Sequence, residues 1–312
     1  MSLVAISFDE QVVIVTGAGR GLGRLYALEL ARRGAAVVVN DVGGSMRGEG
    51  VDASVADDVV AEIAAAQRRA VASHDSVDSP EGGQAIVDTA LSHFGRLDAV
   101  VSNAGIFGSV AFDELTAAEW RRMLSVHLDG AFYLSQPAFR VMKAQGYGRF
   151  VFVTSSAGLF GQPMEAHYAA AKAGLLGLTN VIALEGADHG ILANAVLPFG
   201  YSRMVAETIG VFDEPDETPS FLKAIQPELV VPAVVYLASR ACALTHHNLS
   251  AGAGRYSRVF LGLGEGWLAE PGSRPDADDF AANLPAVVAT EPFTVPGSIF
   301  DEVFELCAKL GL

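Results

Sequence analysis

The chain has 312 residues, of which 51% are hydrophobic and 33 are glycine, and its formal net charge is -15. This length suits one large α/β domain, and the composition excludes a disordered or collagen-like chain. The negative charge disfavours nucleic acid and anionic membranes as partners, because both carry phosphate groups that repel it. The two cysteines, Cys242 and Cys307, are too few for a disulfide framework, which fits a reducing compartment.

The N-terminal residues, MSLVAISFDEQ, show no basic segment followed by an apolar run, so we expect no signal peptide. Apolar runs such as AAVVV and RFVFV are much shorter than the ~20 residues that a membrane helix needs. We therefore expect a cytoplasmic protein that does not enter a membrane.

Short runs rich in β-branched residues alternate with helix-length stretches rich in Ala and Leu. The predicted strands lie in residues 11–17, 35–41, 68–75, 97–105, 148–155 and 191–198, and the first helices in residues 21–34, 56–69 and 82–95. Apolar runs without polar alternation are typical of a parallel sheet that is buried on both faces. The expected fold is a Rossmann-type, doubly wound α/β sheet with helices on both faces.

Two stretches depart from this alternation. Residues 205–226 are acidic and contain proline, and they are predicted to form a lid beside a strand end. Residues 256–312 are predicted to form a C-terminal extension that packs on the core or on a neighbouring subunit. The dinucleotide-binding and catalytic domain is then expected to cover residues 1–255.

The segment TGAGRGLG joins the first predicted strand to the first predicted helix. Gly17, Gly21 and Gly23 would let the backbone turn sharply and approach a pyrophosphate, which the helix N-terminus favours. Arg20 and Leu22 belong to the same predicted cofactor-binding turn. A tight strand-to-helix turn without a ligand is the alternative.

Asp41 ends the second predicted strand, 18 residues after Gly23. A carboxylate at this distance is expected to accept hydrogen bonds from the adenosine ribose hydroxyls and to repel a 2′-phosphate, which favours NAD over NADP. Arg20, Arg24 or Arg47 would favour the 2′-phosphate instead. An NADPH-dependent ketone reductase is therefore the alternative.

Tyr168 and Lys172 lie four residues apart in HYAAAKAG, so a helix would place them on one face. Ser155 follows a predicted strand, 13 residues before Tyr168, and Ser156 offers an alternative hydroxyl. A free phenol has a pKa near 10, so an ammonium and a cationic nicotinamide ring must lie close to favour phenolate at neutral pH. An ordinary exposed helix pair is the alternative interpretation of Tyr168 and Lys172.

Together, TGAGRGLG, SNAG and the Ser155, Tyr168 and Lys172 set resemble the short-chain dehydrogenase/reductase family over roughly residues 8–255. The resemblance implies that Tyr168 exchanges a proton with the substrate oxygen, Lys172 binds the nicotinamide ribose and Ser155 orients the substrate oxygen. It also implies hydride transfer by the cofactor itself. The family further suggests a homodimer or homotetramer formed through the helices that contain Trp120 and Tyr168.

The resemblance places further cofactor-binding residues at the ends of predicted strands. They are Asp75, Ser76, Asn103, Ala104, Gly105 and Pro198. Asn103 corresponds to the family asparagine that steadies the sheet and lines the ribose pocket. Asp75 and Ser76 match the adenine contact, and a turn-forming role is their alternative.

His127, in SVHLDGAF, stands where most family members carry an asparagine that anchors a water chain to the catalytic lysine. An imidazole also donates and accepts, so His127 is a catalytic candidate, and a buried structural histidine is the alternative. With VVVNDVGG and YGRFVFVTSSAG, this segment resembles one subgroup. That subgroup is the (3R)-hydroxyacyl-CoA dehydrogenase, or 17β-hydroxysteroid dehydrogenase, domain of peroxisomal multifunctional enzyme type 2 and its free-standing bacterial relatives.

The expected function is therefore NAD-dependent oxidation of a secondary alcohol on a bulky, apolar small molecule, either a (3R)-hydroxyacyl-CoA or a hydroxysteroid. Phe107, Leu159 and Phe160 are expected to supply apolar contacts. A non-catalytic, nucleotide-binding regulatory subunit is an alternative from a different class. No metal site is expected, because the adjacent His246 and His247 have no carboxylate at a ligand spacing.

Overall fold

The structure is a computed structural model that describes residues 5–201, 219–270 and 272–312. The greater part of the predicted lid, residues 205–218, lies outside the described residues. The described remainder of that segment contains helix α9, Ser220–Ala224. The chain divides into two compact units, Met1–Arg258 and Val259–Leu312.

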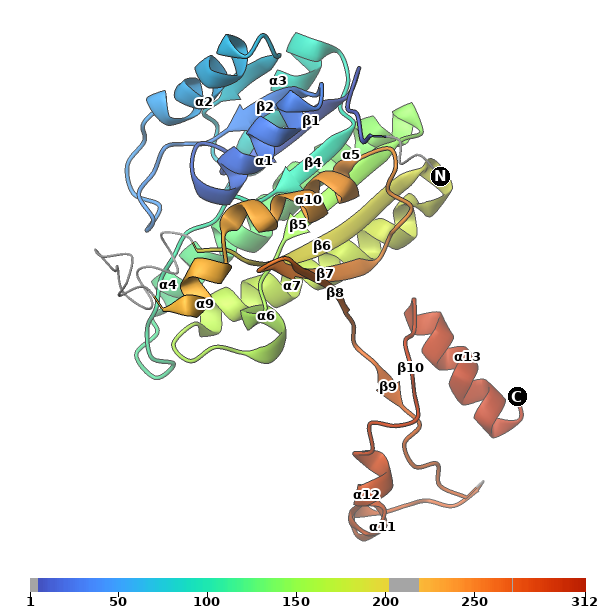
Figure 1. Ribbon diagram of the computed structural model, residues 1–312. Helices are drawn as coiled ribbons and strands as arrows, with labels where there is room; N and C mark the ends of the chain where they lie inside the picture. The colour runs from blue at the N-terminus through green and yellow to red at the C-terminus, as the bar shows by residue number, and fades with distance from the viewer. Residues whose placement is uncertain (1–4, 202–218, 271) are drawn as a thin grey trace. The chain divides into compact units, whose positions relative to one another are not determined.

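The first unit is built around an eight-stranded sheet in the order β3-β2-β1-β4-β5-β6-β7-β8 (Figure 1). Its strands are β1 Val12–Thr16, β2 Ala36–Asn40, β3 Ala70–Ser73, β4 Ala99–Ser102, β5 Gly148–Val153, β6 Ile191–Phe199, β7 His247–Gly252 and β8 Arg255–Val259. The strands from β1 to β7 pair in parallel. The doubly wound α/β fold expected from the sequence is confirmed.

Helices cover both faces of this sheet. They are α1 Gly21–Arg32, α2 Ser54–Ala65, α3 Pro80–Phe94, α4 Ala117–Leu124, α5 Gly130–Gln145, α6 Ala157–Phe160, α7 Ala166–Gly186 and α10 Val231–Ala238. A π-helical turn, Ser125–Asp129, joins α4 to α5, and 3-10 turns cover Ala187–His189 and Pro227–Leu229.

Alternate residues of one strand enter two separate cores. Val13 and Val15 of β1 pack in the cluster that contains Tyr26 of α1, whereas Ile14 packs in the cluster that contains Leu134 of α5. Both clusters are apolar because helices cover both faces of the sheet. The central strands therefore read as continuous apolar runs.

The strand order reverses at β1, which pairs in parallel with β2 on one side and with β4 on the other. Ile14 of β1 lies opposite Val38 of β2 on one side and Val100 of β4 on the other. In open α/β sheets, ligands bind beyond the carboxyl ends of the strands at such a reversal. This edge is where the candidate site lies.

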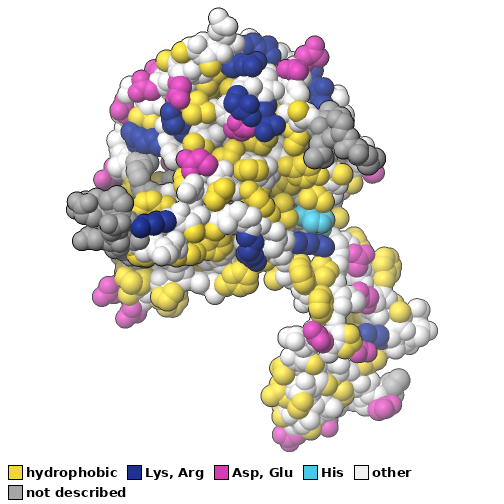
Figure 2. Space-filling model, in the orientation of Figure 1, with side chains coloured by type: hydrophobic (Ala, Val, Ile, Leu, Met, Phe, Trp, Pro, Cys, Tyr) yellow, Lys and Arg dark blue, Asp and Glu magenta, His cyan; other side chains and the backbone are white. Residues whose placement is uncertain are grey.

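The second unit has little regular structure of its own. Its elements are the antiparallel pair β9 Leu263–Gly264 and β10 Phe293–Thr294 and the helices α11 Ala277–Ala282, α12 Leu284–Val287 and α13 Ile299–Leu310. No described residue of the unit is buried, and large apolar side chains such as Phe300 and Phe304 are exposed on it. Figure 2 shows hydrophobic side chains at the surface of this unit. The unit by itself therefore lacks the buried core that stabilises an independent domain. That it packs on the core or on a neighbouring subunit remains a prediction.

Among the described helices, none combines the length and the hydropathy needed to cross a bilayer.

Candidate active site

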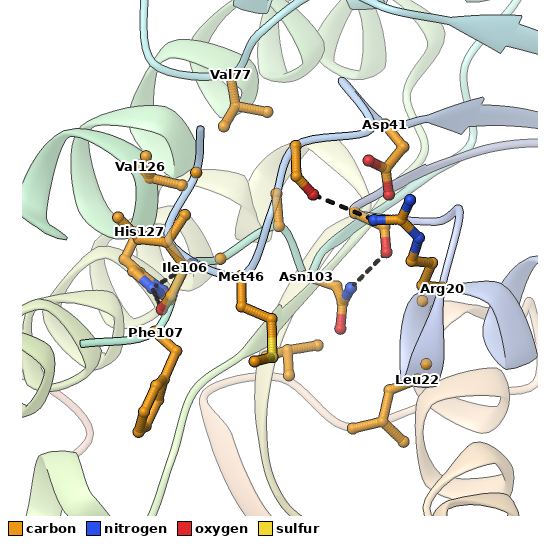
Figure 3. A pocket seen from close by; sticks show the side chains of 18 of the residues that line it. Arg20, Leu22, Asp41, Met46, Val77, Asn103, Ile106, Phe107, Val126 and His127 are labelled. Carbon is orange, nitrogen blue, oxygen red and sulfur yellow. Dashed lines mark hydrogen bonds between the residues drawn. The ribbon is translucent and has the colours of Figure 1, made fainter. Parts of the chain in front are cut away.

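A cavity of about 860 Å³ opens at the carboxyl ends of the central strands. Figure 3 shows Arg20, Asp41 and Asn103 on one side of it and Phe107 and His127 on the other. The structure brings together in its lining all the site residues predicted from the sequence: Gly17, Arg20, Gly21, Leu22, Gly23, Asp41, Asp75, Ser76, Asn103, Ala104, Gly105, His127, Ser155, Tyr168, Lys172 and Pro198. Their roles in binding and catalysis remain predictions.

The glycine-rich turn brings β1, α1 and β4 into close contact. Gly17 has a φ of +62°, and a Cβ atom on it would lie 2.9 Å from the Cα atom of Ala104. A Cβ atom on Gly23 would overlap the carbonyl oxygen of Gly17. Side chains at these two positions would therefore push α1 away from the sheet.

The N-terminus of α1 is open toward the cavity. A Cβ atom on Gly21 would meet no other atom within 4 Å, and no side chain caps the first turn of the helix. The first backbone N–H groups of a helix have no intrahelical partner, and together with the helix dipole they favour an anion. This part of the cavity fits the pyrophosphate of a dinucleotide.

Asn103 ties the end of β4 to the end of β1. Its Nδ2 atom donates to the carbonyl oxygen of Thr16 at 3.0 Å and to that of Gly17 at 3.2 Å. The Oγ1 atom of Thr16 in turn accepts from the backbone N–H groups of Asn103 and Ala104, both at 3.0 Å. These bonds hold the glycine-rich turn against the SNAG segment.

Asp41 is held in place by two backbone groups. The N–H of Gly19 donates to its Oδ2 at 2.9 Å, and the N–H of Gly43 donates to its Oδ1 at 2.7 Å. Each carboxylate oxygen retains a lone pair for a further donor. The carboxylate is thus fixed at the cavity wall with capacity to bind hydroxyl groups.

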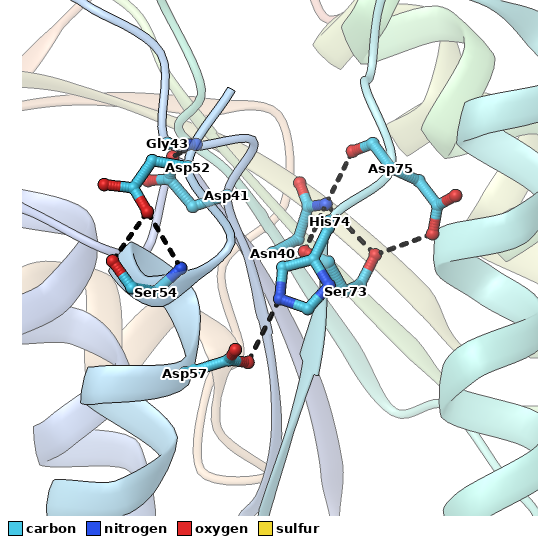
Figure 4. A network of polar contacts seen from close by, with 9 residues as sticks. All are labelled: Asn40, Asp41, Gly43, Asp52, Ser54, Asp57, Ser73, His74 and Asp75. Atoms are coloured by element: carbon cyan, nitrogen blue, oxygen red, sulfur yellow. Dashed lines mark hydrogen bonds and ion pairs between the residues drawn. The ribbon is translucent and has the colours of Figure 1, made fainter. Parts of the chain in front are cut away.

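A second network fixes the ends of β2 and β3 beside Asp41 (Figure 4). The buried Asn40 side chain donates from Nδ2 to the carbonyl oxygens of Asp75 at 2.8 Å and of Ser73 at 3.2 Å. The Ser73 hydroxyl donates to Asp75 at 3.1 Å. Asp75 is therefore a structural strand-end residue as well as part of the cavity wall.

The arginines near Asp41 already have acidic or backbone partners. Arg20 donates to the carbonyl oxygen of Gly44 at 3.1 Å, and Arg24 pairs with Glu62. A polar cleft of about 380 Å³ adjoins these two arginines, and three acidic side chains, those of Asp52, Asp58 and Glu62, line it. This side of Asp41 therefore has no excess of positive charge to bind a 2′-phosphate.

Ser155, Tyr168 and Lys172 come from two elements that a glycine holds together. Ser155 follows β5, and the short helix α6 packs directly on α7, because a Cβ atom on Gly158 would lie 2.8 Å from the backbone nitrogen of Ala173. On α7, the Nζ atom of Lys172 lies 5.6 Å from the ring centroid of Tyr168. The sequence spacing that placed both side chains on one helix face is thus realised.

Burial controls the ionisation of this pair. It raises the pKa of Tyr168 to about 12, and a hydrogen bond with Ser155 opposes that rise. Burial also lowers the pKa of Lys172 to about 7, and its Nζ atom donates to the carbonyl oxygen of Val153 at 2.7 Å. From the sequence we expected the lysine to favour the phenolate, but in the protein alone desolvation dominates.

His127 lies in the π-helical turn and packs against Gly105, on which a Cβ atom would overlap the imidazole ring. Its Nε2 atom is within hydrogen-bond distance of the backbone nitrogen (3.0 Å) and oxygen (2.9 Å) of Ile106, while Nδ1 is buried and has no partner among the described residues. The ring stands edge-on to Tyr168, with centroids 5.2 Å apart. Burial holds the pKa of His127 well below its usual value, and the nearby charge of Lys172 adds a smaller effect in the same direction. The ring is therefore neutral.

The other end of the cavity is largely apolar. Met46, Ile106, Phe107 and Val126 line it, and the backbone N–H of Phe107 donates to the carbonyl oxygen of Met46 at 2.8 Å. The loops after β2 and β4 therefore form one wall.

Two residues expected at this apolar end lie elsewhere. Leu159 packs against the core on the α5 and α7 side of the sheet, and Phe160 is 74% exposed. Neither belongs to the described lining of the cavity, and their contact with the substrate stays a prediction.

The sequence analysis missed a number of lining residues, among them Gly19, Met46, Gln162 and Glu165. Met46 and Gln162 lie in loops, where no periodicity predicts the direction of a side chain. Glu165 precedes the first residue of α7 and has a non-helical backbone, so helical periodicity does not predict its direction either.

Within the described part of the chain, no group of three or more His, Cys, Asp or Glu side chains is placed to hold a metal ion.

Residues 11–209 match the family model for short chain dehydrogenases. With a doubly wound sheet, a glycine-rich turn and the Ser155, Tyr168 and Lys172 set in one cavity, the fold and the site define a nucleotide-dependent oxidoreductase. The chain belongs to the short-chain dehydrogenase/reductase family, whose members act on CH–OH groups.

Similar proteins come from bacteria and from eukaryotes. The chain is 42% identical to the short-chain type dehydrogenase/reductase Rv0148 of Mycobacterium tuberculosis, over 88% of this chain and 92% of the relative. It is 43% identical to peroxisomal multifunctional enzyme type 2 of Mus musculus, over 80% of this chain and 32% of that enzyme. The solved structure of the full-length Drosophila melanogaster multifunctional enzyme type 2 superposes with a TM-score of 0.81 at 30% identity, and the match covers 98% of this chain and 50% of that one.

The resemblance to the multifunctional enzyme seen in the sequence is thereby confirmed. The chain spans a third to a half of the multifunctional enzymes just described, but nearly all of the mycobacterial relative.

Proposed function

We propose that the protein oxidises a secondary alcohol on a bulky apolar substrate, either a (3R)-hydroxyacyl-CoA or a hydroxysteroid, with NAD⁺ as the hydride acceptor. The observation that carries this proposal is the position of Tyr168, Lys172 and Ser155 in one cavity, with a glycine-lined dinucleotide cradle at one end and an apolar wall at the other. A similar protein of Saccharomyces cerevisiae is named peroxisomal hydratase-dehydrogenase-epimerase, which supports the hydroxyacyl-CoA as substrate.

The cavity fits a dinucleotide along its length. Gly17, Gly21 and the N-terminus of α1 would hold the pyrophosphate, and Asp41 would accept from the adenosine ribose hydroxyls. At the far end, Asn103 and Lys172 would bind the nicotinamide ribose, beside Pro198. The nicotinamide, when bound, supplies the hydride acceptor and a positive charge.

Further lining residues would complete the cofactor site. Asp75 and Ser76 would lie at the adenine, where the Asn40 network holds the strand ends. The acidic side chains beside Arg20 and Arg24 support NAD rather than NADP, because they would repel a 2′-phosphate. The alternative of an NADPH-dependent reductase therefore depends on Arg20 leaving its present bond to Gly44.

Tyr168 would act as the general base in oxidation and the general acid in reduction. Ser155 would donate a hydrogen bond to the substrate oxygen and orient its hydroxyl toward the phenol oxygen. Because burial raises the pKa of Tyr168 to about 12, the phenolate needs nearby positive charge. Lys172, with a pKa of about 7, supplies a positive charge and can exchange its proton near neutral pH.

His127 would act as a positioning residue for Lys172. It is neutral, its Nε2 atom is within hydrogen-bond distance of the Ile106 backbone, and its buried Nδ1 atom lacks a partner in the described part of the chain. Buried polar atoms are normally hydrogen-bonded, so Nδ1 is suited to hold a water molecule that leads to Lys172. This is the role that the family gives to an asparagine.

The test is the initial rate of NADH or NADPH formation, followed by absorbance, with NAD⁺ or NADP⁺ respectively and with a (3R)-hydroxyacyl-CoA, its 3S epimer or a 17β-hydroxysteroid. Turnover of one alcohol with NAD⁺ and little with NADP⁺ is the expected result. If NAD⁺ binds and no alcohol reacts, the non-catalytic regulatory subunit becomes the better description. The homodimer or homotetramer and the cytoplasmic location likewise remain predictions.

A further inference from the structure

Glu165 is a buried carboxyl group that the proposed hydride transfer does not use. It lines the cavity one helical turn before Tyr168 and is 6% exposed. It immediately precedes α7, with a φ of -123° and a ψ of 33°, and its side chain lines the same cavity as that of Tyr168. It is therefore placed to touch a substrate bound at Tyr168.

The carboxyl group of Glu165 has one hydrogen-bond partner among the described residues. The Nε2 atom of Gln162 donates to its Oε1 atom at 2.9 Å. No lysine, arginine or histidine forms an ion pair with it in the described part of the chain, and it does not cap its own helix. The Oε2 atom therefore has free acceptor capacity beside the cavity.

The position of Glu165 is unfavourable for forming the Tyr168 phenolate. Burial without a cation raises the pKa of Glu165, and the carboxylate charge raises the pKa of Tyr168. An ionised carboxylate one turn from a general base opposes phenolate formation. A carboxyl group that only filled space here would therefore be worse than a neutral side chain of the same size.

The backbone before Glu165 is also strained. Met164 has a φ of +66°, and its carbonyl oxygen accepts from the N–H of Val110 at 2.8 Å. A non-glycine residue in this region is strained, and such strain is found where a backbone orients functional groups. The loop before α7 is thus held to the loop after β4 in the conformation that places Glu165 in the cavity wall.

We propose that Glu165 is a substrate-recognition residue whose carboxyl group accepts a hydrogen bond from a neutral donor, a hydroxyl or an amide N–H, that the substrate carries near its reacting alcohol. This inference rests on the proposed alcohol dehydrogenase function. A hydroxyacyl thioester of pantetheine carries such an amide N–H, and a steroid diol carries such a hydroxyl. A free hydroxy acid is disfavoured, because its carboxylate would meet that of Glu165.

The test compares ligands that differ only in this donor. One pair is the N-acetylcysteamine thioester of a (3R)-hydroxyacyl chain and its S-(2-acetoxyethyl) analogue, in which oxygen replaces the N–H. The other pair is a steroid diol and the same steroid without its second hydroxyl. Binding to the NADH-saturated protein is measured by calorimetry for the wild type, Glu165→Gln and Glu165→Leu. The control is Glu185→Gln, at an exposed position on the same helix.

In the wild type and in Glu185→Gln, the donor-bearing ligand of one pair is expected to bind about tenfold tighter than its partner. The ratio should fall close to one in Glu165→Leu and keep an intermediate value in Glu165→Gln, whose amide oxygen still accepts. The pair that shows the effect identifies the thioester or the steroid source. A ratio that is unchanged in Glu165→Leu, or a wild type without preference in either pair, overturns the proposal.

Turnover with NAD⁺ is measured in parallel on the same ligands. Its absence in the wild type would refute the proposed function, while the binding ratios would still decide the role of Glu165. A purely structural role would weaken the binding of both members of a pair equally.

Discussion

The two ends of the active-site cavity are built from different parts of the polypeptide. At the cofactor end, backbone groups and glycines dominate, as at Gly17, Gly21 and the N–H groups that hold Asp41. At the substrate end, side chains from three loops meet: those of Met46, of Phe107 and of the loop that precedes α7. The shape of the cofactor end is set by the dinucleotide that it must bind, whereas loops of different sequence can accept different substrates.

This contrast predicts that the cofactor end tolerates almost no added volume. In Gly23→Ala, the new methyl group would overlap the carbonyl oxygen of Gly17, so we expect NAD⁺ affinity to fall about 100-fold or more. The matched control is Gly177→Ala, at a helical position where a Cβ atom meets nothing within 4 Å. It should leave binding unchanged and stabilise the protein by up to about 1 kcal/mol. Calorimetric titration with NAD⁺ and urea unfolding test both.

Lys172 lies between the two ends of the cavity, and its lowered pKa predicts that the stability of the protein depends on pH. Its pKa is 10.5 in an ordinary setting and about 7 in the folded protein, so the unfolded chain binds more protons between these values. The free energy of unfolding should therefore rise with pH in this window, and relative to Lys172→Met the wild type should gain about 2 kcal/mol between pH 7 and about pH 9. Parallel urea titrations measure this, and identical slopes in the two proteins would show that Lys172 is not desolvated.

Asp41 should control cofactor choice. In Asp41→Asn the side chain keeps its shape and loses its charge, so the ratio of kcat/KM for NAD⁺ over NADP⁺ should fall about 10- to 100-fold. Asp52→Asn, in the adjoining cleft, is the comparison variant and should change the ratio less. A ratio that does not move in Asp41→Asn would place cofactor selection on the arginines instead.

The smallest effect is expected at His127. In His127→Asn, an amide can still donate and accept, so kcat should stay within about tenfold of the wild type. In His127→Phe, which fills the same space without polar atoms, kcat should fall further and its pH profile should shift, while KM changes little. Equal profiles in both variants would leave His127 as a structural residue that packs on Gly105.

The cofactor end was predictable because its residues follow from chain distances. A glycine-rich turn, an acid after the next strand and a Tyr and Lys pair four residues apart all become neighbours once parallel strands end at one edge of the sheet. Asn103 and its contacts with Thr16 and Gly17 follow the same logic.

The substrate end was less predictable, because loop conformation decides where its side chains point. Leu159 and Phe160 sit close to Ser155 in the chain but not in the cavity wall. Glu165 enters the wall through the unusual backbone at Met164, which no periodicity encodes. The direction in which the pKa of Tyr168 shifts could not be predicted from the sequence either, because it depends mainly on burial.

The most direct test of the catalytic account is Tyr168→Phe, assayed for both NAD⁺ binding and alcohol oxidation. The variant removes one hydroxyl from the meeting point of the two ends of the cavity. The account predicts an unchanged affinity for NAD⁺ and a loss of kcat of about 10³-fold or more, because the general base is gone. Retention of most of the activity, with NAD⁺ still bound, would contradict the assignment of Tyr168 as the base.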